Sequence, residues 1–194
     1  MNNNSLKIPS QFETERLILR PYKEQDSSDF LRMLNNGNRE YLKELLGDIS
    51  QITDETKIKH WLRELSDSWF AHKLFVLSFW EKKSVLYLGH IWIQPINWDL
   101  PYFEIGWFVE KNHQGLGFVT EAAIESIKFI FKHLNAHNIR VRVREHPPYH
   151  LKSKRIAERC GFKKEGFLRD TVKLEEGTIF GETYFGLLRE EFEF

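Results

Sequence analysis

The segment of this chain best suited to chemistry is a glycine-containing turn, Gln114-Gly-Leu-Gly117, between an expected strand and an expected helix. Such a turn leaves backbone N–H groups unpaired at the positive end of a helix dipole, which favours an anion such as phosphate. Glycine at positions 115 and 117 lets a ligand approach the backbone closely. The turn is not a P-loop, because no Gly-Lys-Ser/Thr follows, and Thr120 takes the third glycine position of a dinucleotide motif. An ordinary turn at a helix start is the alternative.

A carboxylate, Glu104, lies in the strand expected before this turn, between Phe103 and Ile105. The alternation of a strand points it to the face opposite its two apolar neighbours. A carboxylate in an otherwise apolar site is suited to accept a proton near neutral pH, as a general base does. The alternative is a solvated glutamate at the edge of a sheet. The only cysteine, Cys160, is interpreted as a core residue.

Periodicity and turn signals predict the elements that position these residues. In chain order we expect a strand over 16–20, helices beginning at 26 and covering 41–46 and 54–69, strands over 73–80, 84–93 and 102–109, an amphipathic helix to about 134, a strand over 139–144, a helix over 151–160, and strands over 167–174 and 178–188. An antiparallel meander followed by strand–helix–strand–helix predicts a mixed α/β fold, with helices covering the faces of the sheet.

Length and composition exclude several classes of protein. The 194 residues suggest a flexible tail over 1–11 and a single domain over 12–194. Equal numbers of basic and acidic residues, 28 of each, argue against a nucleic-acid binder. The longest apolar run has four residues, so no membrane span is expected, and the start of the chain has no signal-peptide pattern. The histidines lack metal-ligand spacing, so we expect no metal and a cytoplasmic protein.

Five stretches fit the motifs of one enzyme family in the right order. They are Phe12-Glu-Thr-Glu-Arg-Leu-Ile-Leu-Arg-Pro21, Glu104-Ile-Gly-Trp107, Gln114-x-x-Gly117-x-Val119, Phe118-Val-Thr-Glu-Ala122, and Ser153-Lys-Arg-Ile-Ala-Glu-Arg-Cys-Gly-Phe162 with Glu165-Gly-Phe-Leu-Arg-Asp170. Together they resemble the GCN5-related N-acetyltransferase (GNAT) superfamily, and in particular its RimJ/RimL-like branch. The resemblance covers nearly the whole chain.

This resemblance implies a splayed, mixed, mostly antiparallel sheet that holds acetyl-coenzyme A (acetyl-CoA) between two parallel strands. The implied contacts with pantetheine come from the backbone of Trp107, Phe108 and Val109. The implied contacts with pyrophosphate come from Gln114, Gly115, Leu116, Gly117, Phe118, Val119 and Thr120. Arg155, in a basic cluster, is a candidate partner of the cofactor's 3′-phosphate, with a solvated helix face as the alternative.

The implied reaction is direct attack of a primary amine on the thioester, with Glu104 as the base. Many family members use a tyrosine to protonate the thiolate, but Ala157 stands at that place. Ser153 is the matching donor here, and its alternative role is a hydrogen bond within its own helix. His150 stands where the family has asparagine, beside the cofactor's arm, and is a second candidate donor.

Two alternatives stay open. The acceptor is either a protein N-terminus or a small amine, since fold and cofactor motif do not set acceptor specificity. Val119 and His150 depart from the family pattern, which motivates a second reading as a non-catalytic domain that binds or senses acyl-CoA. Dimers are common in the branch, so a homodimer is one of the expected states.

Overall fold

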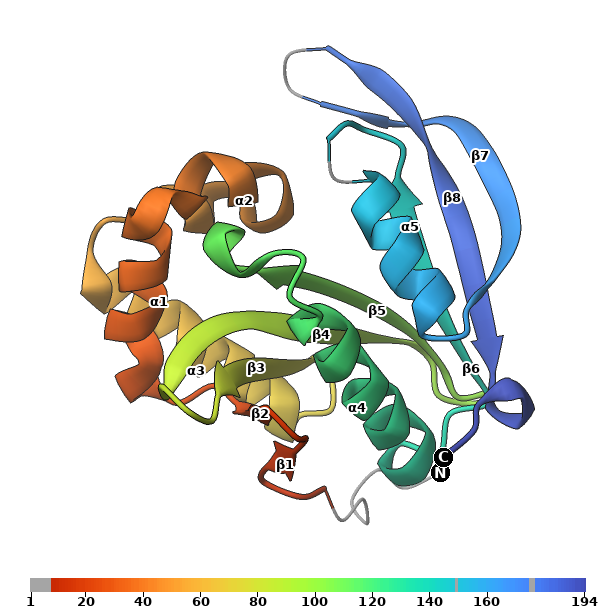
Figure 1. Cartoon of the computed structure of the whole chain (residues 1–194), viewed down its shortest axis with the longest axis horizontal. Coiled ribbons are helices and arrows are strands. Elements are labelled where there is room, and N and C mark those ends of the chain that lie inside the picture. The colour runs from red at the N-terminus through yellow and green to blue at the C-terminus, as the bar shows by residue number, and fades with distance from the viewer. Residues whose placement is uncertain (1–7, 149, 175–176) are drawn as a thin grey trace. The chain divides into compact units, whose positions relative to one another are not determined.

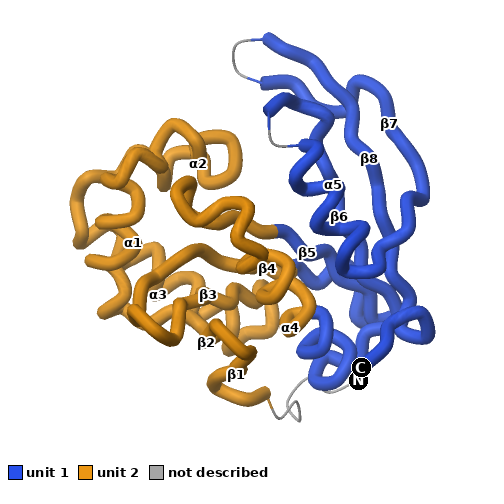
Figure 2. Tube along the Cα trace, in the orientation of Figure 1, with its two compact units in different colours: residues 1–6, 94–106, 127–194 blue, residues 7–93, 107–126 orange. Residues whose placement is uncertain are grey.

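The computed structural model describes residues 8–148, 150–174 and 177–194 (Figure 1). Its strands follow the hydrogen-bonded order β1-β2-β3-β4-β5-β6-β8-β7. Contacts divide the chain into two compact units, of which unit 2 contains Lys7–Ile93 and Trp107–Ser126, and unit 1 contains Gln94–Gly106 and Ile127–Phe194 (Figure 2). Of the expected tail over 1–11, residues 1–7 lie outside the described residues. No helix in the described part of the chain is long and apolar enough to cross a membrane.

Unit 2 combines the first strands with the helical segment expected near the start of the chain. Its elements are β1 (Phe12–Glu13), β2 (Leu17–Pro21), the 3-10 turn η2 (Glu24–Asp26), α1 (Ser27–Met33), the π-type segment η3 (Leu34–Asn38), α2 (Arg39–Leu46), the 3-10 segment η4 (Gly47–Gln51), α3 (Glu55–Phe70), β3 (Phe75–Glu81) and the 3-10 turn η5 (Lys111–His113). Three elements have residues in both units, namely β4 (Leu86–Asn97), β5 (Tyr102–Val109) and α4 (Phe118–His133). β1, β2, β3 and β4 pair antiparallel in sequence order. Of the meander predicted from residues 73–80, 84–93 and 102–109, the antiparallel pairing of the first two strands is confirmed, and β5 follows β4 in the strand order.

An aspartate precedes two of these helices, but only one of the two caps its helix through a side-chain hydrogen bond. The Asp54 carboxylate accepts from the Thr56 N–H at 2.8 Å, which satisfies a free donor in the first turn of α3. Asp26 directly precedes α1, as expected, but its side chain makes no capping hydrogen bond to that helix. It accepts instead from the Lys23 N–H at 2.8 Å and pairs with Arg20 at 2.7 Å. Asp26 is therefore the N-cap of α1 by position only, because the preceding turn η2 takes up its carboxylate.

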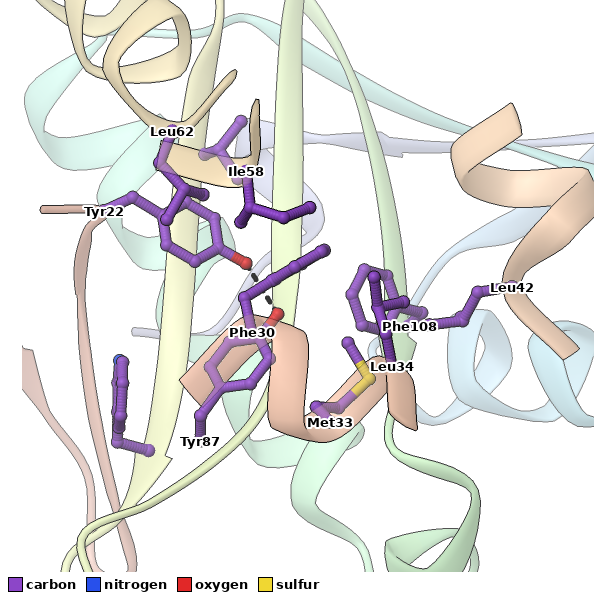
Figure 3. Close-up of a cluster of buried hydrophobic side chains, with 11 residues drawn as sticks. Tyr22, Phe30, Met33, Leu34, Leu42, Ile58, Leu62, Tyr87 and Phe108 are labelled. Atoms are coloured by element: carbon purple, nitrogen blue, oxygen red, sulfur yellow. Dashed lines mark hydrogen bonds between the residues drawn. The ribbon is translucent and has the colours of Figure 1, made fainter. Parts of the chain in front are cut away.

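The core of unit 2 is a cluster of buried side chains from α1, α2, α3 and strands β3 to β5 (Figure 3). Phe108 belongs to this cluster, so its burial anchors the end of β5 that leads to the glycine turn. The cluster also holds polar groups, since Tyr22 Oη lies 2.6 Å from Tyr87 Oη and 2.9 Å from Nδ1 of His90. Burial lowers the pKa of His90 to about 3, so its imidazole is neutral at physiological pH.

Unit 1 is built on the strands β5, β6 (Asn138–Arg144), β8 (Ile179–Leu188) and β7 (Lys163–Lys173), in that order. β6 runs parallel to β5 and antiparallel to β8, and β7 is antiparallel to β8. The helix α5 (His150–Arg159) contacts β6, and the 3-10 turn η6 (Arg189–Glu191) follows β8. This arrangement confirms the predicted mixed, mostly antiparallel sheet. β7 begins four residues before the expected position 167, because the polar start of the strand, from Lys163, pairs with β8.

The apolar stripe predicted for α4 is buried as expected. Its members expose at most 8 % of their surface, and they are Val119, Ala122, Ala123, Ile127, Ile130, Phe131 and Leu134. Spacing of three and four residues places them on one side of the helix. Burial of this side fixes α4, and with it the turn at its N-terminus.

Candidate functional site

The turn predicted to bind an anion begins α4 in unit 2. Gly115 and Gly117 have φ values of +78° and +83°, in the left-handed region that favours glycine. A Cβ at Gly115 would meet no atom within 4 Å, so the outer side of the loop is open. A first intrahelical bond runs from the Glu121 N–H to the Gly117 carbonyl at 3.1 Å. The N–H groups of residues 118–120 precede it in the first turn and have no acceptor within the helix, which is the geometry of an anion site.

Two apolar side chains of this loop differ in exposure. Leu116 exposes 54 % of its surface, whereas Val119 exposes 8 % and belongs to the buried stripe of α4. The branched side chain of Val119 is therefore packed in the core rather than on the open side of the loop. Its departure from the family pattern leaves the backbone N–H groups of the turn in place.

The end of β5 leads into this loop and is held from one side by β4. The Phe108 carbonyl oxygen would lie 2.2 Å from a Cβ at Gly89, so only glycine allows β4 to approach so closely. The parallel register with β6 covers Tyr102 to Glu104, so residues 105–109 lie beyond it. The expected pairing of Trp107, Phe108 and Val109 with pantetheine stays a prediction.

Glu104, the expected base, is buried with 3 % of its surface exposed, but its surroundings are not apolar. Arg140 donates from Nε to Oε2 at 2.6 Å, and Arg142 donates from Nε to the same oxygen at 2.8 Å. Nη2 of Arg142 lies 2.7 Å from Oε1. The expectation of an otherwise apolar site was therefore wrong. The parallel register places Glu104 beside Arg140, and strand alternation brings Arg142 to the same face.

Arg142 connects Glu104 to a second buried carboxylate. Arg142 Nη1 lies 3.6 Å from Oε1 of Glu182, which exposes 5 % of its surface. The hydrogen bond with Glu104 raises the pKa of Arg142, and the pKa of Arg140 is also raised, since attraction to Glu104 outweighs burial. Both oxygens of Glu104 thus accept from guanidinium groups. An incoming proton therefore competes with the guanidinium donors for the lone pairs of the carboxylate.

The candidate donors to the leaving thiolate lie on α5 of unit 1. His150 begins the helix and Ser153 follows three residues later, so both occupy one side of it. Nδ1 of His150 is buried and has no hydrogen-bond partner among the residues that the structure describes. A buried nitrogen without a partner is the kind of group that a ligand or a water molecule satisfies. Arg155 is exposed, and its expected contact with a phosphate stays a prediction.

Two residues that hold the glycine loop were missed by the sequence analysis. Arg16 donates from Nη1 to the Leu116 carbonyl at 2.9 Å and from Nε to Glu121 at 2.7 Å. Asn38 accepts through Oδ1 from the Lys111 N–H at 2.7 Å. Arg16 and Asn38 lie 73 to 105 residues from these partners in the sequence, so no local sequence pattern indicates the contacts. Arg16 nevertheless lies within the first of the five motif stretches.

Cys160 exposes 4 % of its surface, and burial raises the pKa of its thiol to about 12, which confirms its interpretation as a core residue. Within the described ranges, no group of three or more His, Cys, Asp or Glu side chains is arranged to hold a metal ion.

Comparison with known proteins links this geometry to a family. A family model described as "Acetyltransferase (GNAT) domain" matches residues 16–163. The uncharacterized N-acetyltransferase p20 of Bacillus licheniformis is 27 % identical over 92 % of this chain and 96 % of its own length. The uncharacterized N-acetyltransferase YnaD of Bacillus subtilis is 30 % identical over 54 % of this chain, and the match spans only 58 % of YnaD.

A solved structure extends the likeness to the fold. Mycobacterium smegmatis RimJ, in complex with CoA-disulfide, superposes with a TM-score of 0.78 at 19 % identity, over 90 % of this chain and 83 % of RimJ. At this level of identity the match concerns the fold alone.

Proposed function

This chain belongs to the GNAT acetyltransferase family, whose donor is acetyl-CoA, and we propose that it acetylates a primary amine by direct attack in a ternary complex. The observation that carries the proposal is the open loop at the start of α4, with its two left-handed glycines and the free N–H groups of its first helical turn. Such a loop suits the pyrophosphate of coenzyme A.

In this proposal the chain holds the donor mainly through backbone groups. Residues 114–120 bind the pyrophosphate, and the backbone of residues 107–109 pairs with the pantetheine amides. His150 lies along the cofactor's arm, and its unpartnered Nδ1 supports a polar contact there. Arg155 binds the 3′-phosphate from its exposed position. The donor supplies an activated thioester carbonyl, which the chain orients.

The attacking amine must lose a proton as its nitrogen forms the new C–N bond. Glu104 is the proposed acceptor of this proton, directly or through one water molecule. Its two arginine partners, Arg140 and Arg142, keep the carboxylate in one orientation. The bond from Arg142 is the one we expect to open, because its side chain is 40 % exposed, against 24 % for Arg140.

The C–S bond breaks as the tetrahedral intermediate collapses, and the coenzyme leaves as a thiolate. Ser153 and His150 are the proposed donors that stabilise or protonate it. A thiol with a pKa of about 8.5 is a tolerable leaving group, so a hydrogen bond is sufficient. The start of α5 adds the positive end of a helix dipole, which also favours the thiolate.

The acceptor we expect first is a protein N-terminal amine, with a small amine as the second candidate. Support comes from a relative: the putative ribosomal N-acetyltransferase YdaF of Bacillus subtilis is 30 % identical over 46 % of this chain. The rival function is non-catalytic binding of acyl-CoA.

An acceptor panel separates these functions. Purified protein is incubated with acetyl-CoA and, in separate reactions, with N-terminal peptides of varied first residue, polyamines and amino acids. Free thiol is measured against a reaction without acceptor, and products are identified by mass spectrometry. Thiol release that depends on one acceptor class supports the enzyme and names the class. Tight binding of acetyl-CoA without release for any amine would favour the rival.

A further inference from the structure

A cluster of polar contacts lies beside the glycine loop in unit 2. Arg16, from the segment between β1 and β2, donates from Nη1 to the Leu116 carbonyl at 2.9 Å and from Nε to Glu121 at 2.7 Å. The Arg16 N–H donates to the other oxygen of Glu121 at 2.9 Å, and the Thr14 hydroxyl donates to that same oxygen. The guanidinium also lies 4.5 Å from the centre of the Phe118 ring. All five residues belong to unit 2.

Glu121 presents an electrostatic problem for a phosphate site. It lies in the first turn of α4, where its charge suits the positive end of the helix but repels an anion bound at that end. Burial opposes this charge, but hydrogen bonds from Thr14 and Arg16 keep the pKa of Glu121 below its usual value. The carboxylate is therefore ionised at neutral pH, and Arg16 supplies the counter-charge.

The Leu116 carbonyl presents a second problem. An anion-binding loop must direct its N–H groups toward the ligand and its carbonyl oxygens away from it. Leu116 lies between two glycines, whose backbone is the freest to rotate. Arg16 holds this carbonyl, and its Nη2 would lie only 3.3 Å from a Cβ at Gly117, so the guanidinium is in direct contact with the loop.

We propose that Arg16 is a positioning residue for the coenzyme A pyrophosphate: it fixes the peptide between the two glycines and neutralises Glu121. The inference rests on the proposed function, because it assumes that this loop receives the cofactor. It predicts that Arg16 affects donors that carry the pyrophosphate and leaves donors without it unaffected.

The test compares two acetyl donors in wild type and Arg16→Gln. S-acetylpantetheine carries the thioester and the pantetheine arm but no phosphate. For Arg16→Gln we expect kcat/KM with acetyl-CoA to fall about tenfold, mainly through KM, and kcat/KM with S-acetylpantetheine to stay within about twofold. Equal losses with both donors, or no loss with either, would overturn the inference.

Arg63→Gln is the matched control. Arg63 makes a similar ion pair at the surface of unit 2, with Nε 2.7 Å from Glu24, which lies in η2 and not in the glycine loop. Arg63→Gln should leave kcat/KM unchanged with both acetyl-CoA and S-acetylpantetheine. Circular dichroism and thermal unfolding of both variants establish that each is folded at the assay temperature.

Glu121→Gln tests the electrostatic part of the inference without altering Arg16. Calorimetry with coenzyme A should give a dissociation constant equal to or below that of the wild type. The double variant Arg16→Gln/Glu121→Gln should bind more tightly than Arg16→Gln alone, because the uncompensated carboxylate is gone. If the double variant binds coenzyme A no more tightly than Arg16→Gln, or if Glu121→Gln binds it more weakly than the wild type, the electrostatic part of the inference is contradicted.

If wild type itself does not bind coenzyme A, the proposed function fails instead. If Arg16→Gln does not fold, the Glu121→Gln titration still decides.

Discussion

Glu104 has two roles: it is the proposed base, and it is the shared hydrogen-bond partner of Arg140 and Arg142. Glu104→Gln keeps the size of the side chain but removes its charge. We expect turnover to fall about 10²-fold, as for loss of a general base, with the affinity for coenzyme A unchanged. The unfolding free energy should also fall by about 1 to 3 kcal/mol, because part-buried Arg140 and Arg142 lose their counter-charge.

The control for this experiment is Glu182→Gln, which removes the more distant carboxylate, 3.6 Å from Arg142. This variant should lose stability without a comparable loss of turnover. Steady-state kinetics below the unfolding temperature measure the loss of turnover, and denaturant-induced unfolding measures the loss of stability. Turnover of Glu104→Gln close to wild type, with the identified acceptor, would leave Glu104 a purely structural role.

Ser153 and His150 share the proposed role of hydrogen-bond donor to the leaving thiolate. Ser153→Ala should lower kcat by about tenfold at most, equivalent to about 1.4 kcal/mol of transition-state stabilisation. The double variant Ser153→Ala/His150→Gln should lose more than the product of the two single losses, since each donor partly replaces the other. The measurement is kcat between pH 6 and 8. A double variant no slower than the slower single variant would rule out shared donation.

Among the elements, the kinked segment η3 links the first helices to η5, which precedes the glycine loop. Gly37 has a φ of +77°, and fully buried Asn38 donates to the Met33 carbonyl at 2.8 Å while accepting from the Lys111 N–H at 2.7 Å. Asn38→Ala leaves both groups without this partner, so the unfolding free energy should fall by about 2 to 3 kcal/mol. The affinity for coenzyme A should fall as well, because η5 and the loop lose their anchor.

Asn35→Ala is the matched control for this substitution. Asn35 belongs to the same segment, and its side chain accepts an exposed bond from Arg39 at 2.8 Å. Chemical unfolding and calorimetry with coenzyme A compare the two variants. Equal affinities in wild type and Asn38→Ala would show that η3 does not support the loop.

The strands of unit 2 carry a pH-dependent contribution to stability through His90. Burial lowers the pKa of His90 to about 3, whereas an unfolded histidine titrates near 6.5. The unfolded state therefore binds the extra proton first, so this contribution is complete above pH 6.5 and is lost as the pH falls toward 3. Between pH 7 and pH 5 the loss should be about 2 kcal/mol.

His90→Gln removes the titrating group while keeping a polar side chain near Tyr22. Its unfolding free energy should be lower at pH 7 and should vary less between pH 7 and pH 5 than that of the wild type. Urea denaturation at a series of pH values provides the comparison. Parallel pH profiles for the two proteins would show that His90 does not titrate on unfolding.

For the molecule as a whole, periodicity located the helices and strands because each depends mainly on its own residues. α4 and its buried stripe, the glycine turn and β5 all follow from local spacing. The family motifs then supplied the fold, which the matched domain over residues 16–163 confirms.

What the sequence did not predict depends on contacts between distant segments. The arginine partners of Glu104 arise from the register of two strands about 36 residues apart. The contact of Arg16 with Glu121 joins residues 105 apart. Neither register nor tertiary contact leaves a local pattern, although the alternating arginines of β6 are visible in the sequence and would have argued against an apolar setting for Glu104.

The central claim is that this chain transfers acetyl groups from acetyl-CoA bound at the loop of residues 114–120. The most direct test measures acceptor-dependent thiol release and acetylated product together, for wild type and Gly117→Glu. Gly117 has a φ of +83° on the exposed loop, so a glutamate there adds strain and negative charge at the proposed pyrophosphate site. We predict equal amounts of thiol and product with wild type, and a kcat/KM for acetyl-CoA lowered by more than about tenfold in folded Gly117→Glu. Undiminished kcat/KM in that variant, or no product from wild type with any amine, would contradict the claim.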